Sequence, residues 1–560
     1  MTNKNFQRYS RSGLKRALYV GVSAGVLGSA ALAQVTQSDP PVKLQTDYFG
    51  YGASVTARVG YSDNINLGSE GQEDDDIILS TSFSGGLITS TNRFTGLVLG
   101  DLDFSFLADD GDFRVNQNVG GTGTATIAEN WLYFDVSGQT SRQLVGDNAR
   151  FSGNLNAGRG ERTDVHSFSL SPYVYHQFAD QSSASLRYRF SQVFVDGDGD
   201  GGFLDLGLDD STSHEAIAQY SSGGLLNRAR FVLSAYGNST EQGEDNFFPI
   251  EYQQGSFTGQ GEFALTPRFS LSGAVGYDEV DTDGIASLFF DDDELSGVFW
   301  RAGFTARPNR RARVRIEYGQ RYDDDFIDAD VSYQITQRLN FRAGANRTFQ
   351  TRTRNISGRF QEVQTQTLLF ADQLREGGEA SPRSVINNAN QFASTLTGFN
   401  AQTIGVGVIN QAFVALSGRY DRSNWALSGA YIDSDFGFRE IESFDITGNF
   451  NRRLSRRLNG YARAFYRRAD TTVDPEVCIA NPQLFGFDVS DPDLDLDTDC
   501  MAFADGTGVT NTLGGTVGAS YRVYENVSAF GEYTYTNRFS PVEALEFEEN
   551  AVFIGLTLDF

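Results

Sequence analysis

The chain has 560 residues with 45 basic and 72 acidic side chains, and its net charge of −27 excludes a basic nucleic-acid-binding surface and disfavours binding to anionic lipid. Hydrophobic residues make up 39% of the chain, and beyond residue 33 no run reaches the ~18 apolar residues of a membrane-spanning helix. The 13% aromatic content disfavours a disordered acidic chain, and 60 Gly with 45 Phe favour many strands and tight turns.

The first 33 residues have the pattern of a secretory signal peptide. Their basic start carries Lys4, Arg8, Arg11, Lys15 and Arg16 and no acidic residue. An apolar run from Ala17 to Ala33 follows and ends in a small-x-small cleavage site; it is too short and glycine-rich for a membrane anchor, the alternative. Cleavage leaves 40 basic and 72 acidic residues, a net charge of −32. Residues 34–48 then form a polar periplasmic leader, too short for a separate plug domain.

Residues 49–560 form one domain in which alternating segments are separated by short polar turns. We expect ten such turns, near Asn92-Arg93, Glu129-Asn130, Asp180–Ser182, Leu226–Arg228, Thr266–Arg268, Pro308–Arg310, Thr336–Arg338, Arg422–Asn424, Leu454–Arg457 and Tyr524–Asn526. Longer acidic connections lie between them, including 73–76, 196–210, 291–294 and 323–325. Short periplasmic turns and long extracellular loops are typical of outer-membrane barrels. The pattern predicts an all-β, antiparallel transmembrane barrel of about 22 strands, within a range of roughly 18–24, with both termini periplasmic.

Each expected strand has one apolar face and one charged or small face. In the segment 311–318, Val314 and Ile316 alternate with Arg313, Arg315 and Glu317. An arginine facing lipid at mid-depth costs about 2–4 kcal/mol, so the charged face is expected to line the lumen. A soluble sandwich would instead turn its apolar face inward. The arginines that alternation places in the lumen are Arg187, Arg189, Arg228, Arg230, Arg301, Arg313, Arg315, Arg342 and Arg463.

These arginines allow two interpretations. They can line an open channel and set its ion selectivity. Alternatively, they pair with acidic side chains across neighbouring strands and fill the lumen. Alternation alone does not decide between the two.

Residues 354–403 interrupt the rhythm of hairpins. The part from Phe360 to Arg375 is expected to be helical, and Gly377-Gly378 end it. As a connection on the extracellular side, this segment either folds into the barrel and narrows the pore or forms an exposed cap.

Two other connections contain candidate sites. Cys478 and Cys500 lie in the acidic loop 470–510 and are expected to form a disulfide in an oxidising compartment. The same loop has alternating acids that can bind a divalent cation or remain solvated, and these acids are Asp491, Asp493, Asp495, Asp497 and Asp499. Asp196, Asp198 and Asp200 begin like a calcium loop, but Gly207 stands where the bidentate Glu belongs. We therefore expect no cofactor, with Ca²⁺ in the loops as an alternative.

Nothing in the sequence marks an enzyme. The three histidines are His166, His176 and His214, and no nearby serine motif supplies a nucleophile. A barrel enzyme is the remaining alternative.

The last strand ends the chain with an aromatic residue. Phe560, Leu558, Leu556 and Ile554 share one face, and Phe553 is the one large residue on the opposite face. A terminal aromatic with this alternation resembles the signal read by the outer-membrane barrel assembly machinery. An edge strand of a soluble sheet is the alternative, which the export signal disfavours.

Two early segments resemble a known family. Tyr61-Ser62-Asp63-Asn64-Ile65-Asn66-Leu67 closes the first expected strand, and Gly123–Gln143 contains Glu129-Asn130-Trp131-Leu132-Tyr133-Phe134-Asp135. Both are similar to a family of β-barrel porins found near exopolysaccharide and exosortase (PEP-CTERM) loci. The similarity covers the first third of the mature chain. It implies an outer-membrane barrel that serves polysaccharide export and implies no catalytic residues.

Taken together, the sequence predicts a Gram-negative outer-membrane barrel that passes hydrophilic solutes or exopolysaccharide through an arginine-bearing lumen. The alternative is a non-conducting surface barrel whose acidic loops bind cations or a partner. The expected partners are outer-membrane lipid and lipopolysaccharide, the barrel assembly machinery and polysaccharide export components, with no nucleic acid.

Overall fold

The computed structural model describes the barrel and most of its connections. The described residues are 48–144, 150–154, 156–158, 162–196, 210–223, 228–243, 250–284, 292–351, 406–437, 439–480, 482, 496, 498, 500–501 and 508–560. Within these ranges, no helix has the length and apolar content needed to cross a membrane.

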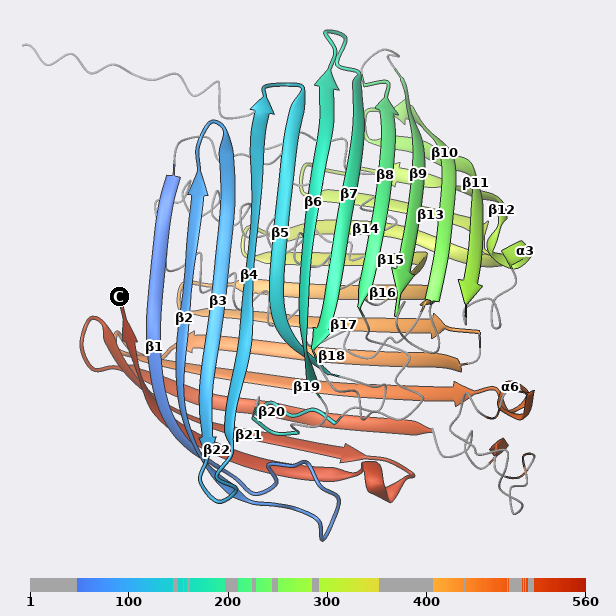
Figure 1. Ribbon diagram of the computed structural model, residues 1–560. Coiled ribbons are helices and arrows are strands. Elements are labelled where there is room, and N and C mark those ends of the chain that lie inside the picture. Colours follow the sequence, from blue (N-terminus) through green and yellow to red (C-terminus); the bar gives the residue numbers. More distant parts are fainter. Residues whose placement is uncertain are drawn as a thin grey trace, which may run out of the picture.

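Twenty-two strands account for nearly all of this structure (Figure 1). The first eleven are β1 Tyr48–Ser62, β2 Asp76–Ser90, β3 Phe94–Leu107, β4 Phe113–Ala128, β5 Leu132–Leu144, β6 Arg162–Gln177, β7 Ser183–Asp196, β8 Ser211–Ser221, β9 Ala229–Gln242, β10 Ile250–Thr266 and β11 Phe269–Gly284. The other eleven are β12 Gly297–Ala306, β13 Ala312–Arg321, β14 Asp324–Thr336, β15 Leu339–Thr351, β16 Val406–Arg419, β17 Ser423–Asp435, β18 Arg439–Arg453, β19 Leu458–Val473, β20 Val509–Arg522, β21 Val527–Phe539 and β22 Phe547–Asp559. Short helical turns occur at α3 Asp292–Leu295, α6 Pro475–Ala480 and η4 Glu543–Leu545.

Every strand pairs antiparallel with its neighbours in the chain, and the sheet closes on itself. The closing pair is β1 with β22, in nine residue pairs from Ser54↔Asp559 to Ser62↔Ala551. Closure satisfies the backbone groups that an open edge would leave unpaired. The prediction of a closed antiparallel barrel with about 22 strands is therefore confirmed.

The two ends of the barrel differ. The turn end carries the short connections predicted from the sequence, and nine of the ten predicted turns are confirmed. The tenth, Leu226–Arg228, falls between β8 and β9, but residues 226 and 227 lie outside the described residues. The first and last strands also begin and end there, at Tyr48 and Asp559. The opposite end, called the loop end, carries the other connections. One expectation there was wrong: 323–325 is no long acidic loop, because Tyr322 and Asp323 form a two-residue turn with φ of 55° and 53°.

The two faces of the sheet also differ. Large apolar side chains are exposed on the outside, as at Trp300, Ile316, Leu427 and Ile554. The alternate positions carry mostly polar side chains toward the interior. Since a shift of one residue in register would exchange the faces, the alternation in the sequence also fixes the register of each hairpin.

Several predictions lie outside the described residues. They concern the signal peptide 1–33, the leader before Tyr48, the connection 354–403 and the acids at 491, 493, 495, 497 and 499. In the calcium-like loop, residues 198 and 200 are also outside, and residue 196 ends β7.

Candidate functional site in the barrel lumen

A buried network of charges occupies the inner wall of β12–β14. Arg301 contacts Glu317 at 3.1 Å and Asp328 at 2.7 Å, and Arg315 contacts Asp328 at 2.9 Å. Glu317 is 0% exposed. Neighbouring strands place the acids side by side, with Glu317 opposite Asp328 in the register. Two arginines thus compensate two carboxylates, which a buried site requires.

A second network lies on β5–β8. Arg187 donates to Asp135 at 2.7 Å and to Ser171 at 3.1 Å, and its guanidinium lies 3.8 Å from the centre of the Tyr173 ring. The adjacent inward arginine, Arg189, contacts Glu215 at 3.2 Å. The structure thus places four of the nine predicted arginines in ion pairs along the wall.

Further arginine sites were missed from the sequence, and one of them is the buried Arg467 on β19, which contacts Asp445 on β18 at 3.8 Å. Arg58 on β1 contacts Asp103 on β3 at 3.1 Å, and Arg321 on β13 contacts Asp278 on β11 at 2.6 Å. Both arginines also lie over aromatic rings. The signal was present, because Arg58 alternates with Ala57 and Val59 as the other lumen arginines do with their neighbours.

The remaining predicted arginines meet solvent. Arg230, Arg342 and Arg463 occupy inward positions on β9, β15 and β19 and are exposed. Arg313 is half-buried on β13, and Arg228 lies in the turn before β9. Part of the lumen wall therefore presents positive charge to water.

The connection between β5 and β6 folds into the barrel. We call its described part, residues 150–154 and 156–158, the inserted segment. The ring of Phe151 lies 5.6 Å from that of Phe465, an inward residue of β19. The backbone of Asn156 accepts a hydrogen bond from Arg114, an inward residue of β4. The inserted segment therefore runs along the inner wall from β4 to β19, across the seam where the barrel closes.

Glu549 on β22 holds the middle of the inserted segment. Its carboxylate accepts hydrogen bonds from Asn154 Nδ2 at 2.8 Å and from the Ser152 hydroxyl. On the barrel side it accepts from the Ser62 hydroxyl of β1 at 2.7 Å. Glu549 is 0% exposed. One buried carboxylate thus joins the inserted segment to both strands of the closing pair.

The family-like motif at the end of β1 forms the other support. Asn64 donates to the backbone oxygens of Gly68 and Glu548 at 2.8 and 2.9 Å. Leu67 is fully buried in an apolar cluster with Ile65, Ile78, Leu107, Ala157, Phe547, Ala551 and Phe553. The cluster explains Phe553, the large residue on the inward face of the last strand.

Backbone contacts complete this junction. Arg150 donates to the Leu67 oxygen at 2.9 Å, and the Gly158 amide donates to the Ile65 oxygen at 3.0 Å. Gly158 has φ of +65°, and a Cβ there would lie 2.9 Å from Leu67 Cδ1. A glycine is therefore required where the inserted segment leaves the motif.

The sequence predicted that a different connection would fold into the barrel. The predicted insertion, 354–403, lies outside the described residues, and no prediction from the sequence covered the inserted segment. Its alternating small and polar residues, Ser152, Asn154 and Asn156, were the available signal. They matter only beside Glu549, which is 395 residues away from Asn154.

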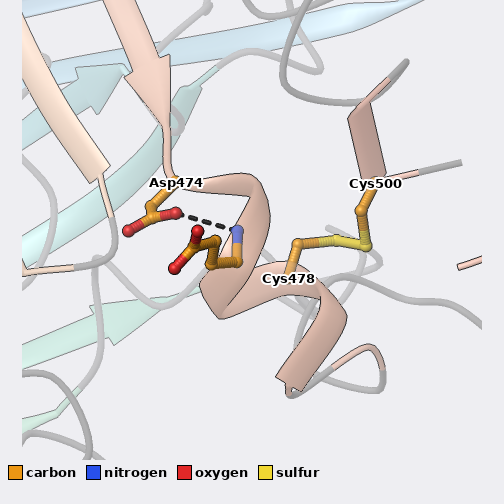
Figure 2. The surroundings of a disulfide bond; sticks show 4 residues. Asp474, Cys478 and Cys500 are labelled. Atoms are coloured by element: carbon orange, nitrogen blue, oxygen red, sulfur yellow. Dashed lines mark hydrogen bonds between the residues drawn. A yellow bond between two sulfur atoms is a disulfide. The ribbon is translucent and has the colours of Figure 1, made fainter. Parts of the chain in front are cut away.

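The loop end carries a disulfide and much acidic charge. Cys478 on α6 is bonded to Cys500, and Asp474 accepts a hydrogen bond from the Glu476 amide at 2.8 Å to begin this helix (Figure 2). Partial desolvation and the carboxylates of Asp110 and Asp76 raise the pKa of Asp74. Among the described residues, no group of three or more potential metal ligands is present.

The three histidines lie on the outer face of the sheet. His166 is hydrogen-bonded to Thr140 at 2.9 Å, and His214 is bonded to Tyr188 at 2.7 Å. His176 stacks on Trp131 at 4.1 Å near the turn end. The three imidazole rings therefore pack among the aromatic and polar side chains of the outer surface.

Comparisons with known proteins find similarity in solved structures alone. No protein-family model matches the chain, and no curated protein is similar in sequence. Similar solved structures include the FrpB iron transporter of Neisseria meningitidis, with 9% identity, a TM-score of 0.47, and coverage of 91% of this chain and 81% of that chain. The siderophore receptor PirA of Acinetobacter baumannii has 8% identity and a TM-score of 0.46, with 93% and 81% covered. The ferric enterobactin receptor PfeA of Pseudomonas aeruginosa has 9% identity and a TM-score of 0.44, with 93% and 81% covered.

Proposed function

We propose that this protein is an outer-membrane channel for hydrophilic solutes, with its loop end outside the cell and its turn end and both chain termini in the periplasm. The observation that carries the proposal is a closed barrel that is apolar outside and has solvent-exposed arginines on its inner wall. Lipid accepts the outer surface, while hydrated solutes require polar groups along their path.

The inner wall divides the proposed path into two parts. Ion pairs and the inserted segment cover one part, so its charges are compensated locally. Arg230, Arg342 and Arg463 face water in the other part. Positive charge that is exposed in the lumen favours anions, so the channel is expected to be anion-selective.

Exopolysaccharide is the specific substrate that we propose, in the export direction. The motif Tyr61–Leu67 supports it through the family resemblance, and the structure gives this motif a position beside the inserted segment. Polysaccharide export components and the barrel assembly machinery, which would read Phe560, are the proposed partners. Deletion of the gene should lower the amount of extracellular polysaccharide. Unchanged secretion would exclude exopolysaccharide as the substrate but would not contradict the proposed channel.

A closed surface barrel is the second candidate. The inserted segment and the paired charges favour it, because both fill space along the wall. In this candidate the acidic loop end binds cations, lipopolysaccharide or a partner, and the lumen conducts nothing.

Planar-bilayer recording of the purified full chain separates the two candidates. The wild type should give conductance steps, and Glu549→Ala should give larger steps because it removes the side chain that holds Ser152 and Asn154. Glu548→Ala is the matched control, since it removes the same charge from the adjacent, exposed position. A folded barrel without steps, in the wild type and in Glu549→Ala, would establish the closed barrel.

A further inference from the structure

Arginines stand opposite arginines on neighbouring strands at the turn end of the barrel. In four places the backbone amide of one arginine donates a hydrogen bond to the carbonyl oxygen of another arginine across the sheet. Two of these bonds run from Arg307 to Arg268 at 2.7 Å and from Arg419 to Arg338 at 2.8 Å. The other two run from Arg453 to Arg422 and from Arg522 to Arg457, both at 2.7 Å. We call the members of these four pairs the opposed arginines.

The opposed arginines continue the inward faces of their strands. Arg307 is two residues beyond the inward Thr305 of β12, and Arg338 is four residues before the inward Arg342 of β15. The other opposed arginines also stand at even spacing from inward residues of their own strands. Because side chains alternate along a strand, all of them point toward the mouth of the lumen. Each of these side chains is exposed there.

The hydrogen-bonding of the sheet does not explain the choice of arginine. The same backbone bond forms where Ala264 or Gln334 is the donor, and where Trp131 or Asn526 is the acceptor. Side chains directly opposite each other in an antiparallel pair have Cβ atoms about 4.5–5.5 Å apart, and like charges at this distance destabilise the sheet. Four such pairs therefore indicate a function that uses concentrated positive charge.

The acids of this rim do not balance the opposed arginines. Among the described residues of the turn end between β11 and β21, Asp421 contacts Arg338 at 3.0 Å, and Glu525 lies in the turn after β20. The turns before β13 and β19 contain Arg310 and Arg456, which offset these two acids. The net charge of this stretch of the rim is therefore strongly positive.

The positive surface continues from the mouth into the lumen. Arg342 on β15 and Arg463 on β19 are inward arginines of the same strands as Arg338 and Arg457. At about 3.3 Å per residue along a strand, they lie about 13 Å and about 20 Å from these two opposed arginines. The loop end instead carries exposed acids such as Asp74. An anion therefore meets a favourable potential at the turn end and along the wall that follows it.

The arrangement of the pairs indicates a ligand with repeated negative charge. Pairs lie at β15–β16, β17–β18 and β19–β20, which are successive steps around the rim, and the fourth lies at β11–β12. A guanidinium binds the two oxygens of a carboxylate together, with a geometry that lysine lacks. A small anion would occupy one pair, whereas a polymer with a carboxylate in each repeating unit can occupy several pairs at once.

We propose that the opposed arginines bind an acidic polysaccharide at the turn-end mouth of the lumen, through the carboxylates of its repeating units. This inference rests on the proposed function as a glycan channel, and it specifies that the glycan is a polyanion. A bound carboxylate reduces the repulsion within a pair. Binding should therefore raise the thermal unfolding midpoint of the barrel.

Binding of polygalacturonate to the full chain in maltoside micelles tests the proposal. Polygalacturonate should bind and raise the unfolding midpoint, and neutral dextran should do neither. The variant Arg268→Gln/Arg338→Gln/Arg422→Gln/Arg457→Gln leaves one arginine in each pair and should weaken binding by roughly tenfold. Without polygalacturonate this variant should unfold at the wild-type temperature or above it, because it lacks the like-charge repulsion. A lower midpoint would show that the arginines have a structural role and would overturn the proposal.

A matched pair of double variants tests whether position matters as well as charge. Arg422→Gln/Arg457→Gln removes two opposed arginines, and the control Arg310→Gln/Arg456→Gln removes two exposed arginines of the turns that belong to no pair. The control should bind polygalacturonate more tightly than the first variant, and equal losses would overturn the proposal.

Other ligands separate the polysaccharide from its rivals. An equal effect of monomeric galacturonate at the same carboxylate concentration would show a small-anion site, and tighter binding of polyglutamate would show a site for an acidic polypeptide; either result would overturn the proposal. The binding measurements need no conductance. A barrel that binds polygalacturonate but gives no conductance steps would keep this site and remove the channel, whereas conductance without binding would keep the channel and remove the site.

Discussion

Two parts of the inner wall carry arginines drawn from the same sequence pattern, and they differ in what those arginines can do. On β12–β14, the buried Arg301 and the half-buried Arg315 contact Glu317 and Asp328. Arg342 on β15 and Arg463 on β19 also point inward, but their side chains are exposed. The pattern along one strand is identical, so the difference arises from what the register of neighbouring strands places opposite. We call the wall with paired arginines the covered part and the wall with exposed arginines the exposed part. Substitutions in the covered part should change the stability of the barrel, and substitutions in the exposed part should change its ion selectivity.

The largest expected effect is the loss of Glu317. Glu317→Ala leaves Arg301 and Arg315 with one carboxylate between them and should lower the free energy of unfolding by about 3–5 kcal/mol. Urea unfolding of the barrel in lipid vesicles measures this change. Glu317→Gln keeps the shape and should lose most of the same energy, whereas Arg463→Ala on the exposed part should change it by less than about 0.5 kcal/mol. Equal losses at Glu317 and Arg463 would contradict the division of the wall.

The second-largest effect is expected in the inserted segment, which lies on the covered part of the wall. Gly158→Val places a branched side chain at a φ of +65° and against Leu67. The backbone strain alone should cost about 1–2 kcal/mol. We expect faster hydrogen exchange in the inserted segment and a larger channel conductance. Gly71→Val is the control, because Gly71 has φ of +81° with open space around it; the same conductance change in both variants would show that the inserted segment does not narrow the path.

The exposed part should respond in selectivity with little change in stability. Replacing both Arg342 and Arg463 by Glu makes the charge of the lumen more negative by four units, two at each position. This change should shift the ion selectivity of the channel toward cations. The reversal potential in a salt gradient measures the shift. The same measurement on Arg187→Ala should show a smaller one, because Asp135 already compensates Arg187. A larger shift at Arg187 would mean that the paired arginines face the path of the ions.

The smallest expected effect concerns the rim of the loop end. The raised pKa of Asp74 means that the folded chain holds this proton more tightly than the unfolded chain does, so charged Asp74 destabilises the folded state at neutral pH. Asp74→Asn should therefore raise the unfolding midpoint slightly at pH 7. The advantage should shrink as the pH falls through the raised pKa and vanish below the ordinary aspartate value of about 3.9. A gain that is equally large at pH 7 and below the ordinary aspartate pKa would contradict this explanation.

The sequence by itself determined the barrel. Period-two alternation, ten short turns and the last strand are local features, and a closed sheet between lipid and water is the arrangement that satisfies them. The same alternation placed Arg187, Arg301 and Arg315 on the inner wall. Each of these inferences uses residues within one hairpin.

Only the tertiary structure decided which charges are covered and which segment folds inward. Arg58 meets Asp103 across β2, and Asn154 meets Glu549 across 395 residues of sequence. Such contacts depend on barrel closure, which brings β1, β22 and the β5–β6 connection to one place.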